Sequence, residues 1–184
     1  MKNFFKNKKH LRRVLLGALV FLTAMAQNVP WLKGIYGVRA VPLLPLVIAI
    51  AVLDQALPGV IFGAIAGLLW DVVSPAAVPH SLYLTCAAFT CAMLMRYVLI
   101  RNKLTVSLLM LLFTAVYLFL RWGTDYALLP GGAFALLRYS LPNLAYTMLL
   151  AAPVYLLTRG IVRYTSRRPK AYVPGELRWE EEPS

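Results

Sequence analysis

Acidic side chains are scarce in this chain, which has only seven Asp and Glu among 184 residues, against 19 Lys and Arg. Charged residues of both signs make up 14% of the sequence, whereas soluble domains carry about 25%. Hydrophobic residues make up 60%, and the mean hydropathy is +0.69. This composition argues against a soluble enzyme and against a disordered chain. It predicts an all-α integral membrane protein.

Cysteine and histidine are also rare, with two of each. Cys86 and Cys91 lie five positions apart, which places them about 140° apart around a helix and off a common face. His10 and His80 have no ligand partner at helical spacing, and His80 is predicted to stand alone in a loop. No phosphate-binding loop, HExxH motif or Ser-His-Asp set occurs. We therefore expect no disulfide framework, metal, cofactor or catalytic residue, and no nucleic-acid-binding motif is present either.

Apolar segments separated by short polar breaks predict about six transmembrane helices. In order, they cover residues 15–31, 41–57, 58–73, 81–100, 105–120 and 133–157. The second and third segments hold roughly 16 residues each, which is short for a full span. They are interpreted either as two short spans with a tight turn or as a hairpin that does not fully cross.

The chain is expected to have three parts: a basic cytoplasmic N-terminus (1–13), a polytopic transmembrane domain (14–162) and a disordered cytoplasmic tail (163–184). The first apolar run has two interpretations. It is either a retained helix or the core of a signal peptide, with Ala24-Met25-Ala26 as the cleavage site.

The distribution of basic residues predicts that both termini lie in the cytoplasm. With that orientation, only four of the 19 Lys and Arg fall on the outer side. These four are Lys33, Arg39, Arg121 and Arg138. The basic termini are expected to meet anionic lipid at the inner face of the membrane.

The third predicted span contains a stripe of glycines. Gly59, Gly63 and Gly67 recur every four residues, and Asp71 continues the spacing. Glycines at this period let a second helix backbone approach closely. The stripe is therefore either a docking seam for the helix of another protein or a site of ordinary packing within the chain.

Ionisable residues at the ends of apolar helices are candidate functional residues. We predict that Asp71 pairs with Arg138 or Arg121 near the outer side, and that Asp54 pairs with Arg96 near the inner side. A proton relay through Asp71 is the weaker alternative, because no chain of further acids or histidines accompanies it. Gln27, at the end of the first span, completes the polar candidates.

Three stretches of this sequence resemble the rod shape-determining protein MreD family. The first is AMAQNVPWL, and the last is LPNLAYTMLLAAPVYLLTRGI. The middle stretch runs from RAVPLLPLVIAIAVL into PGVIFGAIAGLLWDVVSP, where Gly63, Gly67, Asp71 and Ser74 meet the family's G-x-x-x-G-x-x-x-D-x-x-S pattern. Pro79-His80 departs from the glycine expected after the serine loop.

The resemblance implies a non-enzymatic scaffold of the bacterial cell-elongation (Rod) complex in the inner membrane. Such a scaffold binds the transmembrane helix of MreC and connects through it to MreB, RodA and penicillin-binding protein 2. The MreD family is also similar in fold to the S components of energy-coupling-factor transporters, so a vitamin-binding S component is the alternative. Its ligand cleft would draw on an outer polar set. That set comprises Gln27, Asn28, Arg39, Asp71, Asp125, Arg138 and Asn143.

Overall fold

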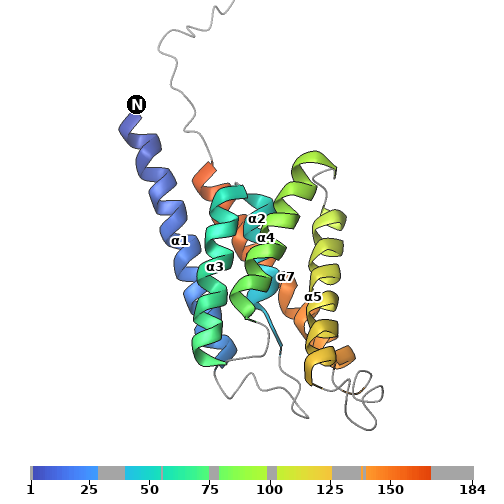
Figure 1. The fold of residues 1–184 in the computed structure, drawn as a ribbon. Coiled ribbons are helices and arrows are strands. Elements are labelled where there is room, and N and C mark those ends of the chain that lie inside the picture. Colours follow the sequence, from blue (N-terminus) through green and yellow to red (C-terminus); the bar gives the residue numbers. More distant parts are fainter. Residues whose placement is uncertain are drawn as a thin grey trace, which may run out of the picture.

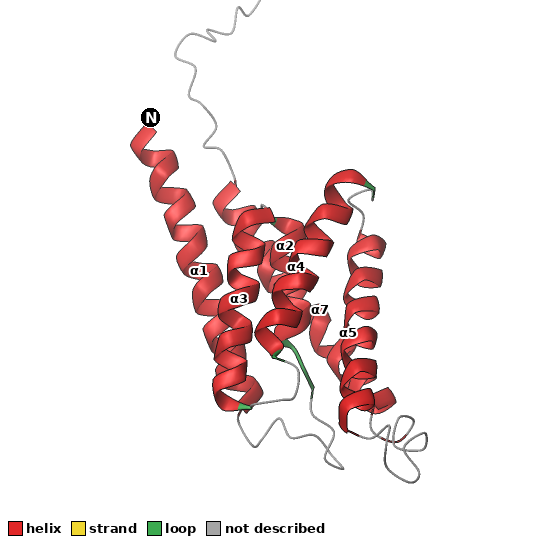
Figure 2. Cartoon of the chain, in the orientation of Figure 1, coloured by secondary structure: helices red, strands yellow, loops and turns green. Residues whose placement is uncertain are grey.

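The protein is described by a computed structural model, which covers residues 2–28, 40–54, 56–74, 79–98, 103–125, 138 and 140–166. Within these ranges the chain forms six helices and no strand (Figures 1 and 2). The helices are α1 (Lys2–Asn28), α2 (Leu43–Leu53), α3 (Ala56–Val73), α4 (His80–Tyr97), α5 (Lys103–Asp125) and α7 (Leu141–Ser166). The all-helical class is therefore confirmed for the described part of the chain.

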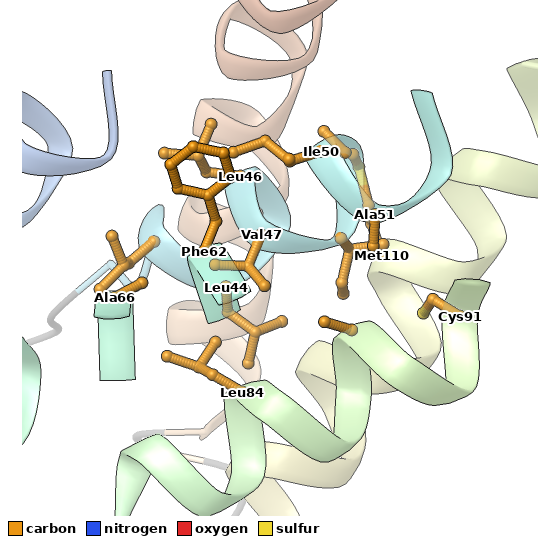
Figure 3. Packing of buried hydrophobic residues seen from close by; sticks show 14 of the residues in the cluster. Leu44, Leu46, Val47, Ile50, Ala51, Phe62, Ala66, Leu84, Cys91 and Met110 are labelled. Atoms are coloured by element: carbon orange, nitrogen blue, oxygen red, sulfur yellow. The ribbon is translucent and has the colours of Figure 1, made fainter. Parts of the chain in front are cut away.

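The short helix α2 forms the centre of the bundle. All ten of its residues from Leu43 to Val52 are buried, and the other five helices all contact it. Figure 3 shows its Leu46, Val47 and Ile50 packed among side chains of the surrounding helices. A helix that is apolar on every side can be surrounded by other helices without burying a polar side chain, which suits this central place. Its 11 residues rise about 16 Å, roughly half the thickness of a bilayer core.

Three of the helices are long and apolar enough to cross a membrane. They are Ala56–Val73 in α3, Leu104–Thr124 in α5 and Leu141–Thr165 in α7. The first half of α1 is basic, and α2 is too short. Three candidate spans are therefore shown, which is compatible with a membrane protein, and the predicted count of six is not established by length and composition.

The outer surface of the bundle is rich in large apolar side chains. Leu57 and Val72 of α3 are 72% and 84% exposed, and Leu149 of α7 is 70% exposed. Water-soluble monomers rarely expose wide apolar surface. Lipid would cover such side chains without cost, so their exposure agrees with a bundle that has its most apolar helix inside and lipid outside.

Both ends of the helical bundle lie on the same side. Helix α1 begins, and α7 ends, at the end of the bundle that we call the basic end (Figure 1). Arg12 and Arg13 belong to this end, as do Arg96 at the end of α4 and Arg163 at the end of α7. The path of the chain thus agrees with the predicted clustering of basic residues beside both termini.

Helix α1 is part of the core. Leu16, Val20 and Ala24 are at most 3% exposed, and α1 contacts α2, α3 and α7. This is the packing expected of a retained helix. The proposed tail, residues 163–184, is helical as far as Ser166, and the rest of it lies outside the described residues.

Candidate functional site

The glycine stripe of α3 faces other helices of the same chain. A Cβ atom at Gly59 would lie 2.5 Å from the Cα of Ala51 in α2. A Cβ atom at Gly63 would lie 2.9 Å from the carbonyl oxygen of Leu84, and one at Gly67 would lie 2.6 Å from the backbone nitrogen of Ser81, both in α4. Only glycine lets the backbones come this close.

This geometry decides between the two interpretations of the stripe. All three glycines are buried, and α2 and α4 already occupy the space above them. The stripe is a packing seam within the chain, and its interpretation as a docking seam for a partner helix is wrong. A second backbone cannot enter because there is no open face to receive it.

Asp71, in the last turn of α3, caps the start of α4. Its Oδ1 accepts a hydrogen bond from the backbone N–H of His80 (2.7 Å), and its Oδ2 accepts one from the N–H of Ser81 (2.9 Å). The first N–H groups of a helix have no carbonyl partner within the helix. A side chain at the N-cap position usually supplies one, but here that position is Pro79, which makes no such bond. The carboxylate of Asp71 serves instead, and its negative charge also suits the positive end of the helix dipole.

His80 completes this contact. Its Nδ1 lies 2.8 Å from Oδ1 of Asp71, and its ring stacks on Trp70 with the ring centroids 4.1 Å apart. His80 is only 3% exposed. The prediction of a lone loop histidine is therefore wrong, because His80 is the first residue of α4 and is held by two residues of α3. We call Gly59, Gly63, Gly67, Asp71 and His80 the α3 clamp.

The predicted ion pair between Asp71 and Arg138 or Arg121 is also wrong. Among the described residues, the Asp71 carboxylate makes its hydrogen bonds to His80 and Ser81. Since both oxygens accept hydrogen bonds from groups at the start of α4, the carboxylate has its partners there rather than in an arginine.

Two tyrosines extend the aromatic stack from the clamp towards α5. The ring of Tyr117 lies 5.5 Å from that of Trp70 and 5.3 Å from that of Tyr83. The hydroxyl of Tyr83 donates a hydrogen bond to the carbonyl oxygen of Phe113 (2.5 Å). Helices α4 and α5 otherwise touch little, so these contacts are the main link between α5 and the clamp.

A second polar contact lies nearer the basic end of the bundle. Arg12 of α1 pairs with Asp54 at the end of α2, with 2.9 Å between the guanidinium nitrogen and the carboxylate oxygen. The Asp54 side chain is 1% exposed. The predicted pairing with Arg96 is wrong, because Asp54 pairs with Arg12, and the Arg96 guanidinium lies over the ring of Tyr97, 5.5 Å from the centroid. The sequence does not single out Arg12 as a partner of Asp54, because Arg12 is one of several cations in the basic N-terminus.

The outer polar set does not gather into a ligand site in the part of the chain that the structure describes. Gln27 is 7% exposed, and its side-chain oxygen has no hydrogen-bond partner among the described residues. The carboxylate of Asp71 already accepts hydrogen bonds from His80 and Ser81. Arg39 and the side chains of Asn28 and Asp125 lie outside the described residues. Within those residues there is also no group of three His, Cys, Asp or Glu that could hold a metal ion.

The clamp contains three members of the glycine–aspartate pattern, Gly63, Gly67 and Asp71, and Ser74 closes it by donating its backbone N–H to the carbonyl oxygen of Trp70 (2.8 Å). Gly63, Gly67 and Asp71 therefore each have a structural task between α3 and α4, whereas the bond of Ser74 uses only its backbone. Comparison of the chain with models of protein families, with curated proteins and with solved structures gives no match.

Proposed function

We propose that this protein is a membrane scaffold of the bacterial cell-elongation complex, of the MreD type, residing in the cytoplasmic membrane with both termini inside. In this proposal it holds the transmembrane helix of MreC and reaches RodA, penicillin-binding protein 2 and MreB through it. It carries out no reaction of its own. The six helices form an S-component-like arrangement of about six transmembrane segments, in which α2 is too short to cross the membrane completely.

The proposal is supported mainly by one observation: the residues of the glycine–aspartate pattern hold α3 against α4. Gly67 and Asp71, one turn apart on α3, meet the same short segment of α4, His80 and Ser81. A transporter or an enzyme would need its intramembrane acid available to a substrate or proton. Here that acid is used to fix two helices to one another, which supports a rigid body that other proteins bind.

The partner helix must then use an outward face. The large apolar residues on the outer side of α3 follow helical spacing, and lie opposite the glycines. They are Leu57, Ile61, Ile65, Leu68 and Val72. Since α2 and α4 already cover the glycine side of α3, MreC can bind without disrupting the bundle only at an exposed apolar face such as this one.

The proposal predicts the result of depleting the protein from its native cells. Rod-shaped cells are expected to widen and become round, because synthesis along the cell cylinder loses its scaffold. A plasmid copy of the wild-type gene should restore rods, as should a copy carrying Gly160→Ala, a position with nothing within 4 Å of an added Cβ. Light microscopy measures both.

Depleted cells that keep their shape but lose uptake of a vitamin would contradict the scaffold and support an S component. Uptake of radiolabelled vitamins into the same depleted cells distinguishes the two results.

A further inference from the structure

Helices α5 and α7 leave an apolar groove between them, with a volume of about 450 Å³. On α5 it is lined by Met110 and Leu111, and on α7 by Met148, Ala152 and Tyr155. Arg159 closes one end. A second groove of about 430 Å³ lies farther along the same two helices, between Phe119 and Leu144. The first of these, the α5–α7 groove, is lined mainly by apolar side chains, with Ser107 among them, and is cationic at one end.

The cationic end is the basic end of the bundle. Arg159 lies eleven residues after Met148, or about 16 Å farther along α7. Arg163 follows one turn later on the same face, and α5 begins beside this end at Lys103. The groove therefore reaches from the depth of the hydrocarbon core to the level where basic residues meet lipid headgroups.

Arg159 has a charge that nothing in the described part of the chain neutralises. Among the described residues, Asp54 pairs with Arg12 and Asp71 contacts His80, and no described carboxylate lies within 4.0 Å of Arg159. Burying its methylene groups along the groove while its guanidinium stays at the rim is the usual arrangement for an arginine at a membrane interface.

We propose that the α5–α7 groove binds one anionic phospholipid, with an acyl chain along Met110 and Ala152 and the phosphate at Arg159. An acyl chain matches the apolar walls, and the anionic headgroup supplies a counter-charge that Arg159 lacks within the part of the chain that the structure describes. An apolar partner helix would fill the walls but leave the guanidinium without an anion. This site is independent of the scaffold function proposed above, and it stands or falls on its own test.

Native mass spectrometry of the full chain in mild detergent tests the proposal. Dioleoylphosphatidylglycerol and dioleoylphosphatidylcholine are added in turn, and the association constant of the first bound lipid is measured. We expect the anionic lipid to bind more tightly, and Arg159→Gln to weaken it about fivefold, the effect of one cation near the surface. Arg159→Lys should retain most of the binding. Arg13→Gln, an exposed arginine of the same end outside the groove, should leave it unchanged.

Filling the groove gives an independent variant. Ala152→Phe should reduce binding of the anionic lipid, whereas Ala18→Phe, at an exposed position of α1, should not. Equal binding of the two lipids, or equal loss in Arg13→Gln and Arg159→Gln, would overturn the proposal. A photoreactive residue at position 152 gives a further test in native membranes. Crosslinking to another protein rather than to lipid would also overturn the proposal.

Discussion

Gly67→Ala is expected to lower the Tm of the purified protein in mild detergent by about 4–8 °C, which corresponds to about 2 kcal/mol of overpacking. The added Cβ would lie 2.6 Å from the backbone nitrogen of Ser81 and 2.9 Å from the carbonyl oxygen of His80. These are backbone atoms of α4, so no side chain can turn aside to make room. Helix α4 must move away from α3, and that movement also pulls His80 and Ser81 from Asp71. Gly59→Ala should cost a similar amount, because it meets the backbone of Ala51.

Gly160→Ala is the matched control, because the same atom is added in a helix where nothing lies within 4 Å. It should leave Tm unchanged or raise it slightly, since alanine favours the helix over glycine by up to about 1 kcal/mol. Thermal unfolding followed by intrinsic fluorescence measures all three variants. A wild-type Tm in Gly67→Ala would show that α3 and α4 do not approach as closely as the structure has them.

Asp71→Ala is expected to reduce stability by about 1–2 kcal/mol, the range found when a helix loses its N-terminal capping side chain. The backbone N–H groups of His80 and Ser81 would lose their acceptor, and the ring of His80 would lose the contact at its Nδ1. Asp71→Asn should fall between wild type and alanine. Its amide oxygen still accepts a hydrogen bond, but the charge that favours the positive end of the α4 dipole is gone.

Ser74→Ala is the control for Asp71, because Ser74 follows α3 directly and the bond described for it uses the backbone N–H. Its effect should stay within about 0.5 kcal/mol. Unfolding in increasing concentrations of SDS, measured for all four proteins, gives the order of stability. If Asp71→Ala were as stable as wild type, the carboxylate would have no capping role.

Much of the helical arrangement was predictable from the sequence. The unbroken apolar character of residues 43–53 indicates a helix that can be buried on all sides, and the predicted segment 41–57 is short for a full span. The segment 58–73 was predicted nearly to its ends, since α3 covers Ala56–Val73 and places Pro58 in its first turn. Proline did not end α7, which continues through Pro153 to Ser166.

The partners of the polar residues were not predictable in the same way. Asp71 and His80 are nine residues apart, and their spacing does not indicate that α4 begins at His80. Pro79 was the available signal. A helix that begins after proline lacks a capping side chain, so its N–H groups require an acceptor from elsewhere.

The Arg12–Asp54 pair was missed for a related reason. Arg12 stands in a run of cations, and the charge count that gives the orientation treats these residues as equivalent. The partner of a single arginine depends on where α1 packs against α2, and Leu16 and Val20 of α1 are buried in the same apolar cluster as α2.

The glycine stripe shows what its spacing can and cannot specify. The period of four correctly indicates a close helix–helix approach, as Gly59 and Gly67 demonstrate. It does not say whether the approaching helix belongs to the same chain. In this fold α2 and α4 are the nearest helices, and they are joined to α3 by short connections that favour internal packing.

The scaffold account is tested most directly by affinity purification of the tagged protein from its native membrane in mild detergent. Mass spectrometry then identifies both the proteins and the small molecules that accompany it. The account predicts MreC together with RodA and penicillin-binding protein 2, and no metabolite in equal amount with the chain. A vitamin bound one-to-one, accompanied by the ATPase subunits of a transporter, would contradict it and identify an S component instead.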